Sequence, residues 1–430
     1  MEKCQVKEKI FHRFFKKIDI RLEIGYNIYM DKKRIAIIGG GAAGLFLANL
    51  LTKHDVVLFE RGERLGKKLS STGNGQGNIT NLSVTEEGYF SVQGRTGFAE
   101  QLVKDADNCA LEKFFKNLGV VVCADERGRV YPAGRQASSL TDALRFSLSE
   151  KGAEVYLSTH ITDIEKKEGG FLLTAEIGED KKKARYYADA VVLCCGGKAA
   201  KNFGTDGSAY ALAEKFGHTV TPLYPSLVQF KTDTVYTKTL KGIRVMDGGL
   251  TARTATGEEY ALTGDIIFTD YGVSGDAVFR VSAFVADKIS KGVTLEIDFL
   301  PHLTETEIYE TLQRKRKAFP SLPDTELLFG IVNNQVGRAI LKRAQGDLKK
   351  ASSLVKRFGL NVTGSLGFDY AQVTKGGIPL AEITDALESK FVKGLYFAGE
   401  ILDVDGQCGG YNLQWAFSSA YCVAKALERL

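Results

Sequence analysis

The sequence predicts an α/β fold that an inserted domain interrupts, and three observations carry this prediction. Apolar runs at residues 35–38 and 56–59 are typical of buried parallel strands on either side of a helix. Short β-like segments separated by turns fill residues 220–300, and sequence with helical spacing follows at 303–358. A further strand signal at 391–399 precedes a final helix. Since 430 residues can bury more than one core, we expect two or three domains.

Glycines with the spacing G-x-G-x-x-G follow the first apolar run. Gly39 permits a tight turn, Gly41 lets the backbone approach a pyrophosphate, and Gly44 lets the next helix pack close to the strand. The second apolar run ends at Glu60, about 20 residues further on, where dinucleotide-binding folds carry the acid that binds the ribose hydroxyls. Together these features predict a Rossmann-like fold that binds FAD or NAD rather than NADP.

The segment after Glu60 favours FAD over NAD. A nicotinamide dehydrogenase usually continues into its next helix there, but residues 61–81 form a long polar loop. Glycines alternate with polar residues in this loop, so backbone N–H groups can line a bulky anionic cofactor, and Lys67 and Lys68 can offset phosphate charge. The residues of this half of the chain that we assign to the cofactor are Gly39, Gly41, Ala42, Ala43, Gly44, Glu60, Arg61, Lys67, Lys68, Thr72, Gly73, Gly75 and Asn78.

Several segments carry a resemblance to a known family. They are GGGAAG at 39–44, GKKLSSTGNGQGNITN at 66–81 and GLYFAGEILDVDGQCGGYNLQWAFSSA at 394–420, with further matches at 128–144, 268–282 and 374–378. The chain resembles the bacterial NAD(P)/FAD-dependent oxidoreductases of the 3-dehydro-bile-acid delta(4,6)-reductase-like or aminoacetone-oxidase type. The resemblance runs from about Lys33 to the C-terminus.

The resemblance implies a domain order. It predicts a glutathione-reductase-type FAD-binding domain whose two parts, 31–217 and 366–430, flank an inserted substrate-side domain of β-barrel plus helices at 218–365. Residues 1–30 are expected to be an N-terminal extension outside the fold, because Met30 followed by DKKRIAIIGG has the form of a natural start. The alternative for this extension is a basic amphipathic helix on a membrane surface.

The resemblance also implies roles for residues in the second half of the FAD site. A strand pair within 153–176 would give adenine a backbone contact at Ile161. Gly196 and Gly197 match the glycine pair that closes many FAD domains, and Gly399 precedes Glu400, which takes the place of the acid that binds the ribityl chain. In the final helix, Gly410, Tyr411, Asn412 and Leu413 would offer backbone N–H groups and a positive helix end to the flavin O2.

The catalytic residues are unknown from the sequence. No metal-ligand spacing and no Ser/His/Asp arrangement appears, and none of the five histidines lies in a flavin motif. Arg129, Tyr131, Tyr271 and Tyr411 lie in motifs and could donate a proton or shape a pocket. Cys408 lacks a paired cysteine, so a buried neutral thiol is expected.

Composition limits the partners. The net charge of +5 is mostly carried by residues 1–30, so charge alone does not indicate DNA or RNA. We expect no integral membrane span and no metal, and the seven cysteines without a C-x-x-C spacing favour a reduced, cytoplasmic location.

The predicted activity is that of an FAD-dependent oxidoreductase. The leading reaction is NAD(P)H-dependent reduction of an activated, enone-type C=C bond in a small molecule through flavin N5, with NAD(P)H as a transient electron donor. The alternatives are an amine or amino-ketone oxidase, and an RNA-binding flavoprotein of the tRNA-modifying type. We expect the substrate pocket between the two domains, with Tyr271, Gly272, Ser274 and Gly275 in its lining.

Overall fold

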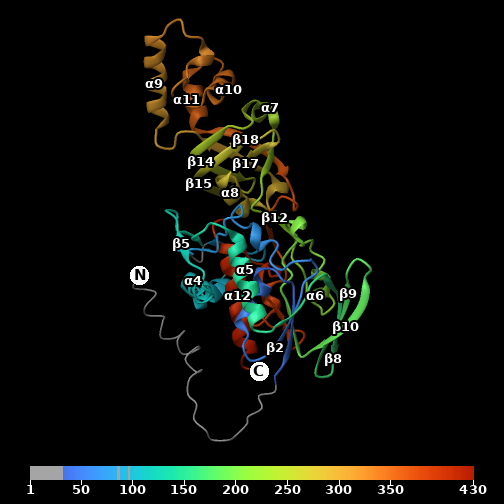
Figure 1. Ribbon diagram of the computed structural model, residues 1–430. Coiled ribbons are helices and arrows are strands. Elements are labelled where there is room, and N and C mark those ends of the chain that lie inside the picture. Colours follow the sequence, from blue (N-terminus) through green and yellow to red (C-terminus); the bar gives the residue numbers. More distant parts are fainter. Residues whose placement is uncertain (1–31, 85–87, 95–96) are drawn as a thin grey trace.

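A computed structural model describes residues 32–84, 88–94 and 97–430. The expected N-terminal extension, residues 1–30, lies outside the described residues. The described chain forms a Rossmann-like domain and an inserted barrel domain, which lie one above the other in Figure 1.

The Rossmann-like domain is built on a five-stranded parallel sheet. Its strands, in spatial order, are β20 (Leu395–Phe397), β11 (Ala190–Leu193), β1 (Arg34–Ile38), β2 (Asp55–Phe59) and β7 (Glu154–Tyr156). The central strands are covered on both faces, which is why they read as unbroken apolar runs; Ile35 and Ile37 are fully buried.

Six helices accompany this sheet in the described part of the domain. They are α2 (Ala42–Leu50), α3 (Gly97–Asp105), α4 (Asn108–Asn117), α5 (Ala137–Glu150), α6 (Tyr210–Glu214) and α12 (Tyr411–Leu427). α12 packs against α2, and its Phe417 ring meets Phe46 of α2 edge-on with centroids 5.4 Å apart. The last helix of the chain thereby closes over the first, which places the C-terminal motif beside the N-terminal one.

Smaller sheets complete the Rossmann-like domain. They are β3 (Thr80–Asn81) with β6 (Arg129–Pro132) and β5 (Val122–Ala124), β8 (Thr159–Lys167) with β9 (Gly170–Ile177) and β10 (Lys182–Ala188), and β4 (Tyr89–Phe90) with β21 (Asp405–Gly406).

The inserted domain is a closed antiparallel barrel. Around the barrel the strands run β13 (Phe230–Thr232), β16 (Gly272–Ser274), β15 (Glu259–Phe268), β14 (Arg244–Thr254), β17 (Val293–Asp298) and β18 (Phe358–Ser365), and β18 pairs back with β13. Inward-facing residues alternate along these strands, as in Leu250 and Ala252 of β14, and form a core of their own. The expected α/β fold with an inserted barrel is thus confirmed.

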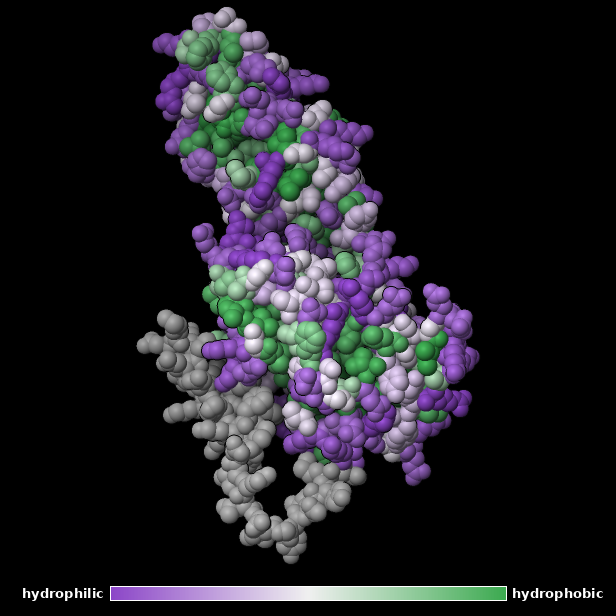
Figure 2. Space-filling view, in the orientation of Figure 1, coloured by the Kyte–Doolittle hydropathy of each residue, from purple (hydrophilic) through white to green (hydrophobic). Residues whose placement is uncertain are grey.

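Helices extend the barrel domain away from the parallel sheet. The helices of this domain are α7 (Thr234–Thr237), α8 (Asp276–Val285), α9 (Glu305–Ala318), α10 (Asn334–Ala344) and α11 (Leu348–Lys356). α9, α10 and α11 stand at the end farthest from the parallel sheet (Figure 1), and we call them the tip helices. Hydrophilic residues are spread over both domains on the face in Figure 2.

Two short strands link the domains. β12 (Tyr224–Ser226) enters the barrel domain and β19 (Val373–Lys375) leaves it, and the two pair antiparallel. The chain therefore crosses between the domains through a paired ribbon.

Candidate cofactor and substrate pocket

At two glycines of the turn after β1, the backbone lies very close to another backbone segment. Gly39 has a φ of +106°, and a Cβ there would lie 2.5 Å from the carbonyl oxygen of Cys194. A Cβ on Gly44 would lie 2.0 Å from the carbonyl oxygen of Gly39, so only glycine lets α2 start so close to the strand.

Gly41 has different surroundings from the other two glycines. It is the N-cap of α2, makes no side-chain cap bond, and has nothing within 4 Å of the place where a Cβ would be. The first N–H groups of a helix lack intrahelical partners and carry positive charge, so this open space favours an anion.

Glu60, at the end of β2, is held by the same turn. One carboxylate oxygen accepts the N–H of Gly40 at 2.8 Å, and the other accepts the N–H of Gly62 at 2.6 Å. Each oxygen keeps a lone pair for a further donor. The carboxylate is therefore fixed at the pocket wall and can accept bonds from hydroxyl groups of a ligand.

The Arg61 side chain forms its polar contacts with other residues of the protein. Its guanidinium donates to the carbonyl of Gly204 and pairs with Asp206 at 3.1 Å. Burial opposes ionisation of Asp206, but the bonds from Arg61 and Ser208 outweigh it and lower the pKa of Asp206. Arg61 thus joins the end of β2 to the loop before α6.

Lys68 and Glu400 form an ion pair inside the pocket. Lys68 Nζ lies 2.8 Å from Glu400 Oε2, and both side chains are mostly buried. Glu400 Oε1 accepts the backbone N–H of Thr374 at 2.9 Å. The pair connects the loop after β2 with the segment after β20, so both halves of the chain meet here.

The N-terminus of α12 also faces the pocket. Its N-cap Gly410 has a φ of +104° and makes no side-chain cap bond. A Cβ on Gly410 would lie 2.4 Å from the backbone of Thr80, so the loop before α12 rests directly on β3. Trp415 fixes the first turn by donating its indole N–H to the carbonyl of Gly399 at 3.1 Å.

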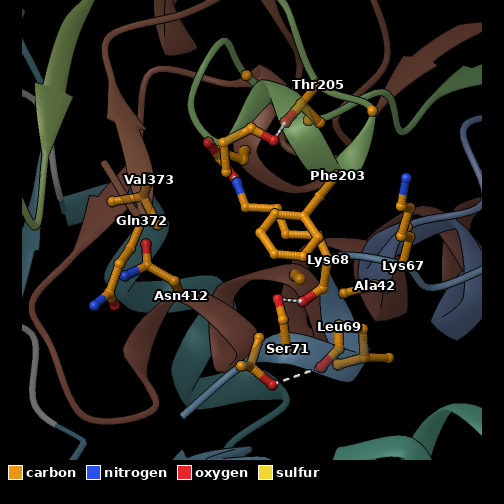
Figure 3. Close-up of a pocket in the computed structure, with 18 of the residues that line it drawn as sticks. Ala42, Lys67, Lys68, Leu69, Ser71, Phe203, Thr205, Gln372, Val373 and Asn412 are labelled. Atoms are coloured by element: carbon orange, nitrogen blue, oxygen red, sulfur yellow. Dashed lines mark hydrogen bonds and ion pairs between the residues drawn. The ribbon is translucent and has the colours of Figure 1, made fainter. Parts of the chain in front are cut away.

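One pocket of about 1510 Å³ is lined by Gly39, Gly41, Glu60, Arg61, Lys68, Glu400 and Gly410 together. Pockets for drug-sized ligands measure roughly 300–1,000 Å³, so this one has room for a dinucleotide and a second molecule. Figure 3 shows Lys67 and Lys68, Phe203 and Gln372 around the same hollow, although they come from three distant parts of the chain.

Most residues assigned to the cofactor from the sequence line this pocket. They are Gly39, Gly41, Ala42, Ala43, Glu60, Arg61, Lys67, Lys68, Thr72, Gly73, Asn78, Ile161, Gly196, Gly197, Gly399, Glu400, Gly410, Asn412 and Leu413. Their contact with a cofactor stays a prediction, but the fold gathers them from both parts of the Rossmann-like domain into one wall.

Three assigned residues do not line the pocket. Gly44 lies behind it, where it allows the close packing of α2. Gly75 uses its carbonyl to accept the N–H of Ala137, which starts α5. Tyr411 is buried and donates its hydroxyl to the carbonyl of Ser83 at 3.0 Å, so its side chain anchors the loop instead of facing a ligand. The packing role predicted for Gly44 agrees with its position, while cofactor contacts of Gly75 and of the Tyr411 backbone stay predictions.

The far end of the pocket lies between the two domains. The Rossmann-like domain contributes Arg129 and Tyr131 from β6, with Arg135 and Cys408. The barrel domain contributes Arg244, Asp265, Ile267, Ser274, Gly275, Asp276 and Phe279. This agrees with the expectation that a pocket forms where the domains meet.

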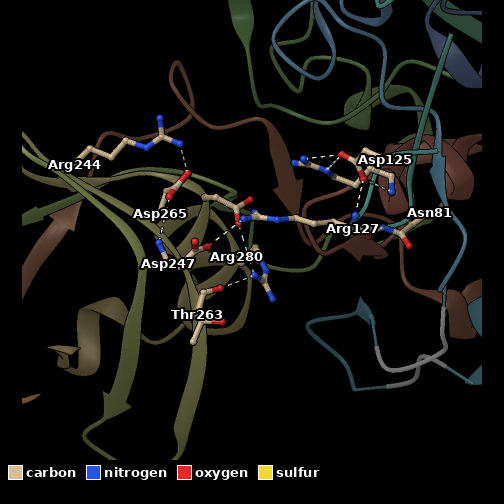
Figure 4. A network of polar contacts seen from close by, with 10 residues as sticks. Asn81, Asp125, Arg127, Arg244, Asp247, Thr263, Asp265 and Arg280 are labelled. Atoms are coloured by element: carbon tan, nitrogen blue, oxygen red, sulfur yellow. Dashed lines mark hydrogen bonds and ion pairs between the residues drawn. The ribbon is translucent and has the colours of Figure 1, made fainter. Parts of the chain in front are cut away.

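Charged side chains connect the two sides of this end (Figure 4). Arg127, on the loop before β6, lies 3.3 Å from Asp247 and 3.6 Å from Asp276 of the barrel domain. Arg244 pairs with Asp265 across the barrel strands β14 and β15. The pocket rim is thus lined by ion pairs, while Phe279 and Ile267 supply apolar surface.

One sequence expectation about this end is wrong in part. Ser274 and Gly275 line the pocket, but Tyr271 and Gly272 do not. Gly272 instead allows close strand contact, because its Cβ would lie 2.4 Å from the carbonyl oxygen of Phe230. Tyr271 directly precedes this strand, and its backbone carbonyl accepts the N–H of Thr232 at 3.0 Å.

Sequence reasoning also missed several lining residues. His160 lines the pocket beside Arg61, and burial lowers its pKa. Asp276 could have been suspected, because it follows the glycine of the conspicuous FTDYGVSGD segment. Arg244, Asp265 and Gln372 carry no signal in the sequence, because only the fold brings them to the pocket.

Comparison with known proteins places this fold in a family. The family model described as HI0933-like protein Rossmann domain matches residues 33–426. The chain belongs to the HI0933-like family. The membership recognised from the motifs, and with it the oxidoreductase class, is confirmed.

Two curated relatives in this family have full-length similarity. The 3-dehydro-bile acid delta(4,6)-reductase of Clostridium scindens is 33% identical over 91% of this chain and 98% of the relative. The ribosomal RNA dihydrouridine synthase of Haemophilus influenzae is 30% identical over 91% of this chain and 98% of the relative. Among solved structures, the 3-ketosteroid-delta4-(5alpha)-dehydrogenase of Rhodococcus jostii RHA1 has a TM-score of 0.48 at 15% identity, over 95% of this chain and 99% of that chain.

The described residues include neither a membrane-spanning helix nor a cluster of metal-binding side chains. Within 32–84, 88–94 and 97–430, no helix is both long and apolar enough to cross a membrane. The same residues hold no group of three or more His, Cys, Asp or Glu side chains that could bind a metal ion.

Proposed function

We propose that this protein is an FAD-dependent oxidoreductase that reduces a C=C bond conjugated to a carbonyl group. The observation that carries the proposal is the single pocket that starts at the N-terminus of α2, passes the N-terminus of α12 and ends at the barrel domain. Such a pocket suits a long dinucleotide with a substrate beside its far end, because both helix ends favour negative charge.

The residues present fit FAD. Glu60 can accept the ribose hydroxyls of the adenosine half, and the open space beside Gly41 can receive the pyrophosphate. Lys68 lies near enough to Glu400 to balance its charge while that carboxylate accepts ribityl hydroxyls. The N-terminus of α12 would favour negative charge at the pyrimidine end of the flavin.

Bound FAD would supply the hydride transfer, which no protein side chain can provide. The chain itself binds the cofactor in a fixed orientation, excludes water and orients the substrate. Phe279 and Ile267 of the barrel domain offer apolar surface, while Arg244 and Asp276 offer polar groups at the same end. This mixture suits a substrate with an apolar body and a few polar groups.

The names of the relatives support the substrate class. One names reduction of double bonds in a 3-dehydro-bile acid, and the other names synthesis of dihydrouridine. In a 3-oxo-4-ene steroid and in uracil alike, the reduced double bond is conjugated to a carbonyl. The same arrangement of hydride and proton donors can therefore serve both substrates.

Electrons are proposed to come from NADH or NADPH. The sequence has one dinucleotide fingerprint, and we assign it to FAD. A nicotinamide donor would then bind transiently at the open end of the pocket. We also keep a cytoplasmic location as a prediction.

A second candidate function is reduction of uridine in ribosomal RNA. The relative from Haemophilus influenzae favours it, as does a ribosomal RNA dihydrouridine synthase of Escherichia coli that is 28% identical over 93% of this chain. The tip helices carry exposed lysines that could contact phosphates, among them Lys317, Lys342, Lys349 and Lys350. The amine oxidase alternative has no comparable support and stays a prediction.

Anaerobic reduction and reoxidation test both candidates. The purified protein should be yellow, release FAD on denaturation and be bleached by NADH or NADPH in a stopped-flow instrument. Reduced protein should then be reoxidised by a 3-oxo-4-ene steroid or by cyclohexenone if the first candidate holds, and by a uridine-containing ribosomal RNA fragment if the second holds.

The result separates the candidates. Reoxidation by RNA alone, weakened steeply by salt, would replace the first candidate with the second. A protein that retains no FAD, or that none of these oxidants reoxidises, would contradict the proposal.

A further inference from the structure

Conjugate reduction needs an acid as well as a hydride donor. The hydride adds to the β-carbon of the double bond, and the α-carbon must receive a proton. A side chain fixed beside the double bond can supply this proton, and positioned acids typically contribute about 10²–10⁴-fold to such steps. The sequence shows no acid signature, so the acid has to be identified from the side chains that line the pocket.

Few hydroxyl or thiol side chains lie at the barrel end of the pocket. Tyr131, Cys408, Ser274 and Tyr370 line it there. Tyr370 is 62% exposed, so solvent surrounds it, and a serine hydroxyl is a weak acid without a neighbouring base. His160 lies at the other end, beside Arg61. Tyr131 and Cys408 remain.

Tyr131 lies beside the loop that precedes α12. Its strand, β6, pairs with β3 so that Val130 is opposite Thr80, and the backbone of Thr80 lies against Gly410. The side chain of Arg129, two residues before Tyr131, lies 3.9 Å from the Cβ position of Gly409. The phenol therefore projects from the strand next to β3, whose backbone touches the loop at the end of the pocket proposed for the flavin ring.

The Tyr131 hydroxyl has no hydrogen-bond partner among the described side chains and backbone groups, although the residue is only 5% exposed. Other buried tyrosines nearby use their hydroxyls within the protein: Tyr89 donates to the carbonyl of Tyr411, and Tyr411 donates to that of Ser83. Tyr131 thus keeps its donor for a molecule in the pocket.

Two arginines flank the Tyr131 ring. The Arg135 guanidinium carbon lies 4.0 Å from the ring centroid, and that of Arg129 lies 5.9 Å away. Asp125 holds Arg129 in place through a contact of 2.7 Å. Positive charge beside the ring stabilises the phenolate that forms when the hydroxyl gives up its proton.

Cys408 has a less suitable environment. It packs against the apolar cluster of Leu227, Ala283 and Val373. Burial, with the Asp276 carboxylate nearby, raises the pKa of Cys408 to about 11. Burial raises the pKa of Tyr131 as well, so the apolar packing of Cys408 is what separates the two groups, and Cys408 is kept as the competing donor in the test below.

We propose that Tyr131 is the catalytic acid that protonates the α-carbon of the substrate double bond. This inference rests on the proposed reduction of a conjugated C=C bond. The π bond breaks as the β-carbon gains the hydride and its electron pair, and the α-carbon takes the proton of the Tyr131 hydroxyl. The phenolate regains a proton from water after product leaves, and the reduced nicotinamide nucleotide restores the electrons.

The test uses Tyr131→Phe in the FAD-loaded, full-length protein. Dithionite reduces the enzyme without a nicotinamide, and cyclohexenone or a 3-oxo-4-ene steroid then reoxidises it. We expect Tyr131→Phe to retain FAD and to be reduced normally, but to be reoxidised at least about 100-fold more slowly. Reoxidation of the wild type in D₂O should place deuterium on the α-carbon.

Two variants serve as controls. Tyr271→Phe removes a hydroxyl outside the pocket lining and should reoxidise as fast as the wild type. Cys408→Ala removes the competing proton donor and should change the rate by less than about tenfold. The inference would be overturned if the reoxidation rate of Tyr131→Phe lay within about twofold of the wild-type rate. It would also be overturned if Tyr131→Phe failed to bind FAD, or if only Cys408→Ala lost most of its reoxidation rate.

The pH profile gives an independent readout. Burial raises the pKa of Tyr131, and the nearby Asp125 and Cys408 raise it further. The positive charges of Arg129 and Arg135 lower it, but the net shift is upward. The acid is therefore protonated at neutral pH, and wild-type reoxidation should fall only on the alkaline side. A profile without this fall would count against Tyr131. Wild type that holds FAD but that neither enone nor uridine reoxidises would instead refute the proposed function, and the inference with it.

Discussion

Among the glycines of the motif, Gly41 differs from Gly39 and Gly44 in the space around its Cβ position. A Cβ on Gly39 or Gly44 would collide with backbone carbonyl oxygens, whereas a Cβ on Gly41 would enter open space. The φ of Gly41 is −78°, which any residue can adopt. A substitution at Gly41 therefore probes the pocket without straining the fold.

We expect Gly41→Val to abolish FAD binding. The added methyl groups would fill the space beside the N-terminus of α2 where the pyrophosphate is proposed to lie. The thermal unfolding midpoint of the protein without FAD should stay within a few degrees of the wild type. The flavin-to-protein absorbance ratio after gel filtration measures the loss.

Gly364→Val is the matched control for this substitution. Gly364 lies on the barrel strand β18, has nothing within 4 Å of its Cβ position and does not line the pocket. Its variant should bind FAD at full stoichiometry. Full flavin occupancy in Gly41→Val would show that the pyrophosphate does not lie beside this turn.

At the scale of single elements, the short strand β21 carries a buried carboxylate. Asp405 is fully buried; one oxygen accepts the hydroxyl of Ser226 on β12 at 3.0 Å, and the other has no hydrogen-bond partner among the described residues. Lys375 of β19 is 3.9 Å away. Burial raises the pKa of Asp405 to about 7, although Lys375 opposes this shift. The ribbon that crosses between the domains therefore packs against a group that titrates near neutral pH.

Asp405 should make stability fall as pH rises between about 4 and 7. The native state keeps a proton there that the unfolded chain, with an ordinary aspartate pKa near 3.9, releases. One such proton changes the unfolding free energy by up to about 1.4 kcal/mol per pH unit. The Asp405→Asn variant lacks this titrating group. The urea concentration at its unfolding midpoint should therefore fall less between pH 5 and 8 than that of the wild type. Urea unfolding at each pH measures the difference.

Asp270→Asn is the control for the pH series. Asp270 is exposed, and its bond to Lys241 lowers its pKa, so its charge stays constant over the same range. Its variant should follow the wild-type pH dependence. Parallel curves for wild type and Asp405→Asn would show that Asp405 does not keep its proton in the folded state.

At the scale of the whole molecule, the described chain has two main hydrophobic cores. One surrounds the parallel sheet and includes Ile35 and Trp415, and the other fills the barrel domain and includes Leu250 and Phe358. The residues assigned to FAD all belong to the first domain. Ligand binding stabilises the cooperative unit that forms the site.

Removal of FAD should therefore lower the unfolding temperature of the Rossmann-like domain more than that of the barrel domain. We expect differential scanning calorimetry to show two transitions, and free FAD at 100 times its Kd should stabilise the Rossmann-like domain by about 2.7 kcal/mol. The barrel transition should move little. A single transition that shifts as a whole with FAD would mean that the domains unfold as one unit.

The sequence by itself determined the cofactor half of this protein. The Rossmann-like fold, the position of Glu60 at the end of β2 and the glycine turn at Gly39 all follow from local spacing. A strand, a tight turn and a helix start are set by neighbouring residues, so a short motif fixes both the backbone and its chemistry. The direction of the Tyr411 side chain does not follow from the motif, because its hydroxyl bonds to a loop more than 300 residues away.

Only the tertiary structure decided the end of the pocket where we propose that substrate binds. Arg129 and Tyr131 meet Asp265 and Asp276 at one end of the pocket, although more than 100 residues separate the two pairs. Apolar and polar residues alternate along barrel strands, and this pattern shows which residues face the barrel core. It does not show which part of the protein the outer face of the barrel contacts. The residues that line this end of the pocket are therefore set by how the inserted domain docks onto the Rossmann-like domain, and that docking has no signature in the local sequence.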